Sequence, residues 1–87
     1  MKIGIIGAGN VGSSTAFSLI IQGIAKEIIL IDSNENKANA EALDISHAIP
    51  FAYAAKIKSG NYSNLTGSDI VIICAGANQK NGETRLA

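Results

Sequence analysis

Three glycines near the amino terminus and one later aspartate have types and spacings that suggest chemistry. Gly7, Gly9 and Gly12 follow the pattern G-x-G-x-x-G, directly after the apolar run at residues 3–6. Asp32 ends a second apolar run about twenty residues beyond Gly12. A glycine turn between a strand and a helix, with an acidic residue closing the next strand, is typical of a site that binds a dinucleotide.

Each glycine has a separate physical task in such a site. Gly7 allows a sharp turn through backbone conformations that a Cβ would penalise. Gly9 removes a side chain, so that backbone N–H groups can approach a pyrophosphate, and Gly12 lets the helix pack closely on the strand. The start of the helix then offers unpaired N–H groups and the positive end of its dipole to the phosphates.

Asp32 indicates which dinucleotide would bind. At the carboxyl end of the second strand, its carboxylate can accept hydrogen bonds from both hydroxyls of the adenosine ribose. A 2′-phosphate at the same place would meet a negative charge, so the sequence predicts NAD rather than NADP. The alternative is a glycine turn without a ligand, in which Asp32 only caps the following helix.

Composition limits the class of protein. The chain has 87 residues, 47% of them hydrophobic, and a formal net charge of zero, which suits one small globular domain and gives no reason to expect nucleic acid or a membrane as a partner. The single Cys74 cannot form an internal disulfide, and the first apolar run is too short and too glycine-rich for a signal peptide. We expect a soluble cytoplasmic protein without a metal site.

The apolar runs and helical periodicity predict an α/β fold. Strands are expected over 2–6, 27–31, 55–59 and 69–74, and helices over 10–22 and 35–48. Runs that are apolar on both faces, such as 27–31 and 70–74, favour parallel strands covered on two sides. The result would be an incomplete doubly wound sheet with strand order 3-2-1-4, both helices on one face and no helix on the other. Lys56 and Lys58 would protect an edge of this sheet.

The two helices are expected to pack through small and branched side chains. In the first helix, the positions at helical spacing are Val11, Ala16, Leu19, Ile20 and Ile24, and in the second they are Ala38, Ala42 and Ile45. Asp44 and His47 stand three residues apart on the second helix, but His47 is best explained as a favourable residue in the last helical turn. Cys74 is expected to be a packed small hydrophobic residue.

Three stretches carry a resemblance to a known family. Residues 7–14 (GAGNVGSS), 31–47 and 75–86 (AGANQKNGETRL) are similar to the amino-terminal part of bacterial L-lactate dehydrogenases, in the lactate/malate dehydrogenase family. The third stretch is much more specific than the glycine motif. This resemblance implies that residues 1–87 are the amino-terminal portion of a Rossmann-type NAD-binding domain, with the rest of the domain and the catalytic domain absent from this chain.

The resemblance also implies roles for individual residues. It places the backbone around Val11 on the pyrophosphate, beside Asn10, and Asp32 on the ribose. Further cofactor contacts are implied at Lys37, Tyr62, Ala75, Gly76 and Ala77. Gln79 would contact the variable group of a 2-oxo or 2-hydroxy acid, and Arg85 would polarise its carbonyl. The family's catalytic histidine and its aspartate partner lie beyond residue 87, so the chain alone is expected to be inactive.

Several alternatives stay open from the sequence. Malate dehydrogenases of the superfamily carry Arg at the position of Gln79, where it pairs the second carboxylate of oxaloacetate, whereas a neutral Gln suits the methyl group of pyruvate. A stand-alone module that binds the adenosine end of NAD, or a methyltransferase with the same first turn, would not need the loop from Gln79 to Arg85. The full enzyme is expected to be a homotetramer, and the uncovered sheet face predicts self-association of the chain.

Overall fold

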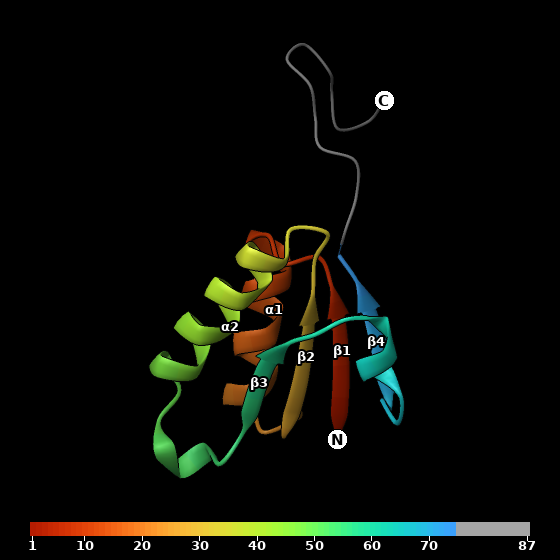
Figure 1. Ribbon diagram of the computed structural model, residues 1–87. Helices are drawn as coiled ribbons and strands as arrows, with labels where there is room; N and C mark the ends of the chain where they lie inside the picture. The colour runs from red at the N-terminus through yellow and green to blue at the C-terminus, as the bar shows by residue number, and fades with distance from the viewer. Residues whose placement is uncertain (75–87) are drawn as a thin grey trace, which may run out of the picture.

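A single parallel sheet forms the centre of the molecule. The computed structural model describes residues 1–74, and its four strands are β1 (Lys2–Ile6), β2 (Glu27–Ile31), β3 (Lys56–Ser59) and β4 (Ile70–Ile73). All neighbours pair in parallel in the order β3-β2-β1-β4 (Figure 1). The expected strands and their order are confirmed, with bounds that differ by a residue at β3 and at both ends of β4.

Two α-helices connect the strands on one face of the sheet. They are α1 (Asn10–Ile21) and α2 (Glu35–Ala48), and both lie on the same side in Figure 1. Gly23, with φ of 75°, follows the end of α1, and the Asn34 side chain caps α2 by accepting a hydrogen bond from the Lys37 N–H at 3.1 Å. Over residues 1–74, neither helix has the length and apolar character needed to span a membrane.

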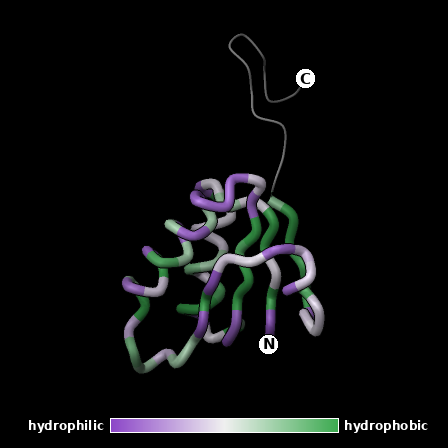
Figure 2. The backbone as a smooth tube through the Cα atoms, in the orientation of Figure 1, coloured by the Kyte–Doolittle hydropathy of each residue, from purple (hydrophilic) through white to green (hydrophobic). Residues whose placement is uncertain are grey.

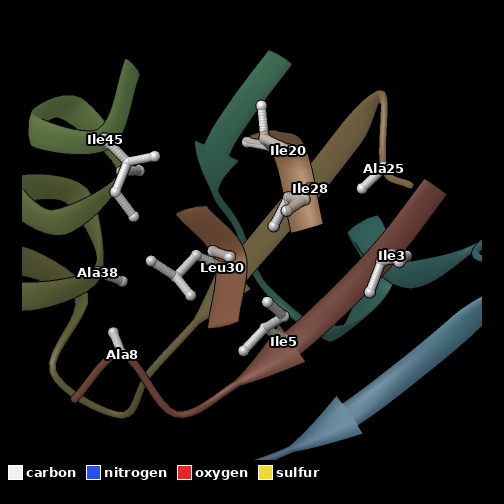
Figure 3. Close-up of a cluster of buried hydrophobic side chains, with 11 residues drawn as sticks. Ile3, Ile5, Ala8, Ile20, Ala25, Ile28, Leu30, Ala38 and Ile45 are labelled. Atoms are coloured by element: carbon white, nitrogen blue, oxygen red, sulfur yellow. The ribbon is translucent and has the colours of Figure 1, made fainter. Parts of the chain in front are cut away.

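The core lies between these helices and the sheet. Large side chains from β1 and β2 meet alanines and two isoleucines from the helices, as Figure 3 shows; the buried cluster includes Ile3, Ile5, Ile28, Leu30, Ala16, Ile20, Ala38, Ala42 and Ile45. Figure 2 shows hydrophobic residues along the central strands and a mixture of hydrophilic and hydrophobic residues along the helices. Small helical residues allow a close approach to a sheet whose strands carry branched side chains.

Two residues that the helical spacing places in the core, Val11 and Ile24, are exposed instead. Val11 is 68% exposed because it lies in the first turn of α1, at the edge of the sheet rather than over it. Ile24 is 44% exposed because α1 has already ended at Ile21, so helical spacing no longer determines its direction. Ala16 and Ile20 are buried as expected, and Leu19 packs against the core.

The other face of the sheet is partly covered by the connection from β3 to β4. This segment runs in front of β2 and β1 in Figure 1 and contains the 3-10 helix η2 (Tyr62–Leu65). A right-handed crossover from β3 to β4 must cross this face, because β4 lies on the opposite side of β1 from β3. Leu65 packs directly over Gly4, and Ile29 on the same face is only 1% exposed. The sequence did not indicate η2, or the 3-10 helix η1 (Phe51–Tyr53).

The prediction that the strand at residues 70–74 is covered on both faces is wrong for the residues that the structure describes. Ile70, Val71 and Ile73 are 45%, 44% and 71% exposed, because β4 is an edge strand here and η2 reaches only part of its face. Cys74 is partly buried against the core, and the exposed lysines Lys56 and Lys58 lie on the other edge strand as expected. Self-association through the exposed β4 side chains stays a prediction.

The start of α1 approaches β1 more closely than a side chain would permit. A Cβ placed on Gly12 would overlap the carbonyl oxygen of Gly7, and it would come within 3.5 Å of Ile5. Gly7 itself has φ of 112°, which favours glycine. The pair therefore sets the angle at which the chain leaves β1 and enters α1.

We expect Gly12→Ala to destabilise the chain by about 1–3 kcal/mol, although alanine is the better helix former, because the new methyl group meets backbone atoms that cannot rotate away. Chemical denaturation monitored by circular dichroism measures this change. Ser14→Ala, at an exposed position in the same helix, is the matched control and should be neutral or slightly stabilising. Equal stability of Gly12→Ala and wild type would contradict the close packing.

Candidate functional site

A pocket of about 410 Å³ opens at the carboxyl ends of the strands, within the size range of small-ligand sites. It lies where β1 is flanked by β2 on one side and β4 on the other, the point at which the strand order reverses. The residues that line it are Ile6, Gly7, Gly9, Ile31, Asp32, Ser33, Asn34, Lys37, Tyr62 and Cys74. Segments from four parts of the chain thus meet at one edge of the sheet.

The glycine turn is held against the end of β2 by two consecutive backbone donors. The Gly7 N–H donates to the Ile31 carbonyl oxygen at 2.6 Å, and the Ala8 N–H donates to Asp32 Oδ2 at 2.8 Å. From the other side, the Ser13 hydroxyl of α1 donates to the Ala8 carbonyl at 3.3 Å. Ala8 is fully buried on this turn, and Figure 3 shows it between β1 and the start of α1.

The first turn of α1 offers backbone donors to the pocket edge. Gly9 is the N-cap residue and has no side chain to cap the helix, and the first intrahelical bond runs from the Ser13 N–H to the Gly9 carbonyl at 2.9 Å. The N–H groups of Asn10, Val11 and Gly12 therefore have no intrahelical acceptor. With the positive end of the helix dipole beside them, they suit an anionic group such as a pyrophosphate.

Asp32 presents an ionised carboxylate at the end of β2. Hydrogen bonds from the Ala8 N–H and then the Asn34 N–H, the second to Oδ1 at 2.9 Å, lower the pKa of this carboxyl below its usual value. Partial burial opposes that shift, while the positive charge of Lys37 and the Ser33 hydroxyl add to it. Asp32 is thus charged at neutral pH, and the acceptor positions not used by the backbone can accept ribose hydroxyls.

Lys37 and Tyr62 complete the described part of the site. The Lys37 Nζ lies 3.9 Å from the point where a Cβ of Gly9 would be, so the ammonium stands beside the glycine turn as well as near Asp32. Tyr62, the first residue of η2, also lines the pocket and is 68% exposed. An exposed aromatic ring at a pocket edge can pack against a planar base.

The structure brings together most of the residues that the sequence indicated. Gly7, Gly9, Asp32, Lys37 and Tyr62 line the pocket, and Asn10, Val11 and Gly12 form the helix start beside it. The remaining expected residues lie outside the described part of the chain: Ala75, Gly76, Ala77, Gln79 and Arg85.

Sequence reasoning did not assign five of the lining residues to the site. They are Ile6, Ile31, Ser33, Asn34 and Cys74, and each lies at or just after the carboxyl end of β1, β2 or β4. The expected parallel topology was a sufficient signal, because the carboxyl ends of parallel strands meet at one edge of the sheet.

The pair formed by Asp44 and His47 does not take part. Both residues are exposed on α2, and His47 lies in its last turn as expected, away from the pocket. Within residues 1–74, no group of three or more His, Cys, Asp or Glu side chains is arranged to hold a metal ion.

Comparison with known proteins agrees with this geometry. The family model described as the lactate/malate dehydrogenase NAD-binding domain matches residues 1–87. An L-lactate dehydrogenase of Thermoanaerobacter sp. (strain X514) is 58% identical over 85 residues, which is 98% of this chain and 27% of that protein. One from Allorhizobium ampelinum is 54% identical over 86 residues, 99% of this chain and 28% of its own length. The chain thus spans little more than a quarter of these relatives.

Solved structures of the same family superimpose on the chain. A ligand-bound minor L-lactate dehydrogenase from Enterococcus mundtii gives a TM-score of 0.84 at 43% identity, covering 98% of this chain and 27% of that one. The malate dehydrogenase of Archaeoglobus fulgidus in complex with NADH gives 0.83 at 41% identity, covering 99% and 30%. The glycine turn, the carboxylate at the end of β2 and the strand order are therefore those of an NAD-binding domain, and this chain belongs to the lactate/malate dehydrogenase family.

Proposed function

We propose that the chain is the amino-terminal part of an NAD-dependent L-lactate dehydrogenase, which interconverts pyruvate and L-lactate by hydride transfer. The observation that carries the proposal is the pocket at the switch point of the sheet, where Gly9, the N-cap residue of α1, and the Asp32 carboxylate line one opening. The named relatives support the choice of substrate, since both curated ones are L-lactate dehydrogenases.

The residues present fit the adenosine half of NAD. The N–H groups at the start of α1 would hold the pyrophosphate, with the Lys37 ammonium beside the glycine turn to balance its charge. Asp32 would accept the ribose hydroxyls, and Tyr62 would lie beside the adenine. NADH supplies the hydride when it is bound, and Gly76 and Ala77 would contact it beyond β4.

The chemistry on the substrate would depend on the loop from Gln79 to Arg85. The guanidinium of Arg85 is permanently charged, which suits an oxygen that gains negative charge as the carbonyl is reduced. Gln79 is neutral, so it leaves the second carboxylate of oxaloacetate unpaired and favours pyruvate. In the full-length enzyme, the proton and the carboxylate-binding group would come from residues beyond position 87.

The first test of this function is cofactor binding by the 87-residue chain. We expect calorimetry to show that NAD binds more tightly than NADP, and that Asp32→Ala weakens NAD binding by about one to two orders of magnitude, because two hydrogen bonds to a charged acceptor are lost. Asp44→Ala removes an exposed carboxylate from α2 and is the control. Unchanged binding in Asp32→Ala would contradict the ribose assignment.

Residues 1–87 by themselves are expected to lack dehydrogenase activity, because they match only 27% of the length of a related L-lactate dehydrogenase. Absorbance at the NADH band, followed with pyruvate and the purified 87-residue chain, should stay constant over the same period in which a full-length relative consumes the cofactor. Measurable oxidation of NADH that depends on pyruvate would show that these residues contain a complete active site.

Substrate choice is tested in the full-length enzyme by Gln79→Arg. The added guanidinium can pair the second carboxylate of oxaloacetate, so the ratio of kcat/KM for oxaloacetate to that for pyruvate should rise by about tenfold or more. Competition kinetics with both acids measures the ratio, and Gln79→Asn, which stays neutral, is the control. An unchanged ratio would remove the argument that separates lactate from malate.

A stand-alone module that binds the adenosine end of NAD is the second candidate. It is favoured by one observation: within the described residues, the pocket already offers Gly9, Asp32, Lys37 and Tyr62 as contacts for an adenosine half. Binding of AMP and NAD with similar affinity, in a natural polypeptide no longer than this chain, would support the module over the enzyme.

A further inference from the structure

The hydrogen bond between Asp32 and the glycine turn suggests a second task for this carboxylate. The ladder between β1 and β2 ends with the bond from the Gly7 N–H to the Ile31 carbonyl, and one residue further the Ala8 N–H donates to Asp32 Oδ2 at 2.8 Å. A side chain thus continues the pairing where the backbone of β2 turns away. The Ala8 N–H is consequently directed at Asp32 and is not a phosphate donor.

The carboxylate has enough acceptor positions for both tasks. An ionised carboxylate has about four lone-pair positions, and the two backbone N–H groups of Ala8 and Asn34 occupy one on each oxygen. The positions that remain can accept ribose hydroxyls. Binding of the ribose therefore does not require Asp32 to release the turn.

We propose that Asp32 is a positioning residue for the pyrophosphate site: by holding the Ala8 N–H, it fixes the glycine turn so that the free N–H groups of α1 point at the phosphates. This inference rests on the proposed function and deepens it. It predicts that Asp32 strengthens the binding of a ligand that has no ribose, such as inorganic pyrophosphate. A carboxylate that only contacted ribose would have the opposite effect on such a ligand, because its negative charge repels anions.

The first measurement needs no variant and no ligand. In the isotope-labelled 87-residue chain, the Ala8 amide resonance should move with pH as Asp32 is protonated, with a midpoint below the usual carboxyl value of 3.8, because the hydrogen bonds favour the charged form. The groups around Asp32 are Lys37 on α2, Ser33 beside it, Tyr62 on η2 and Cys74 after β4. An Ala8 resonance that does not titrate with Asp32 would overturn the proposal.

The second measurement uses inorganic pyrophosphate as the probe. Asp32→Asn should weaken its binding by about three- to tenfold, because a neutral amide oxygen is a weaker acceptor for the Ala8 N–H than a carboxylate, although the variant has lost a negative charge. Asp69→Asn is the matched control, since Asp69 Oδ2 accepts the Lys2 N–H at 2.8 Å at the opposite edge of the sheet. This control should bind pyrophosphate as the wild type does and leave the Ala8 resonance unchanged.

The outcomes separate this inference from the proposed function. If Asp32→Asn binds pyrophosphate equally well or more tightly while NAD still binds to the wild type, the positioning role is wrong and the cofactor site stands. If the Ala8 resonance titrates and pyrophosphate binding weakens as expected, but NAD binds no more tightly than pyrophosphate, the positioning role stands and the assignment of the dinucleotide fails.

Discussion

The close contact between Gly12 and the carbonyl of Gly7 is the constraint on which the rest of the structure depends. Because no Cβ separates the two backbones, α1 begins directly against the end of β1 and its first turn lies at the edge of the sheet. The unpaired N–H groups of that turn consequently lie next to Gly9, which lines the pocket. Any larger residue at position 12 would move the helix away from the strand and the donors away from the site.

The right-handed crossovers between the parallel strands decide which face of the sheet each connection covers. Both helical crossovers move the chain from β1 to β3 along one face, and the return from β3 to β4 must then cross the other face. This return carries η2, so that Leu65 covers Gly4 and Tyr62 reaches the pocket. A segment that is mostly polar in sequence thus both shields the second face of the sheet and supplies a side chain to the site.

The end of β2 combines structural and chemical tasks. Ile31 and Asp32 hold the glycine turn through a carbonyl and a carboxylate, and Asn34 caps α2 while its N–H binds the same carboxylate. Hydrogen bonds from backbone donors keep Asp32 charged without a buried ion pair, which would require desolvation of both partners. Within a few residues, the chain therefore ends a strand, fixes the glycine turn and starts a helix.

The sequence by itself determined the strands, the two long helices, the strand order and the nucleotide-binding character, because unbroken apolar runs, the glycine spacing and Asp32 are local patterns with few structural solutions. Only the tertiary structure decided which apolar residues are covered: Val11 in the first turn of α1 and the side chains of the edge strand β4 are exposed, although both look like core residues in sequence. It also decided the place of η2 and the bond from Ala8 to Asp32. These features depend on crossover handedness and on contacts between residues far apart in the chain, which no local pattern encodes.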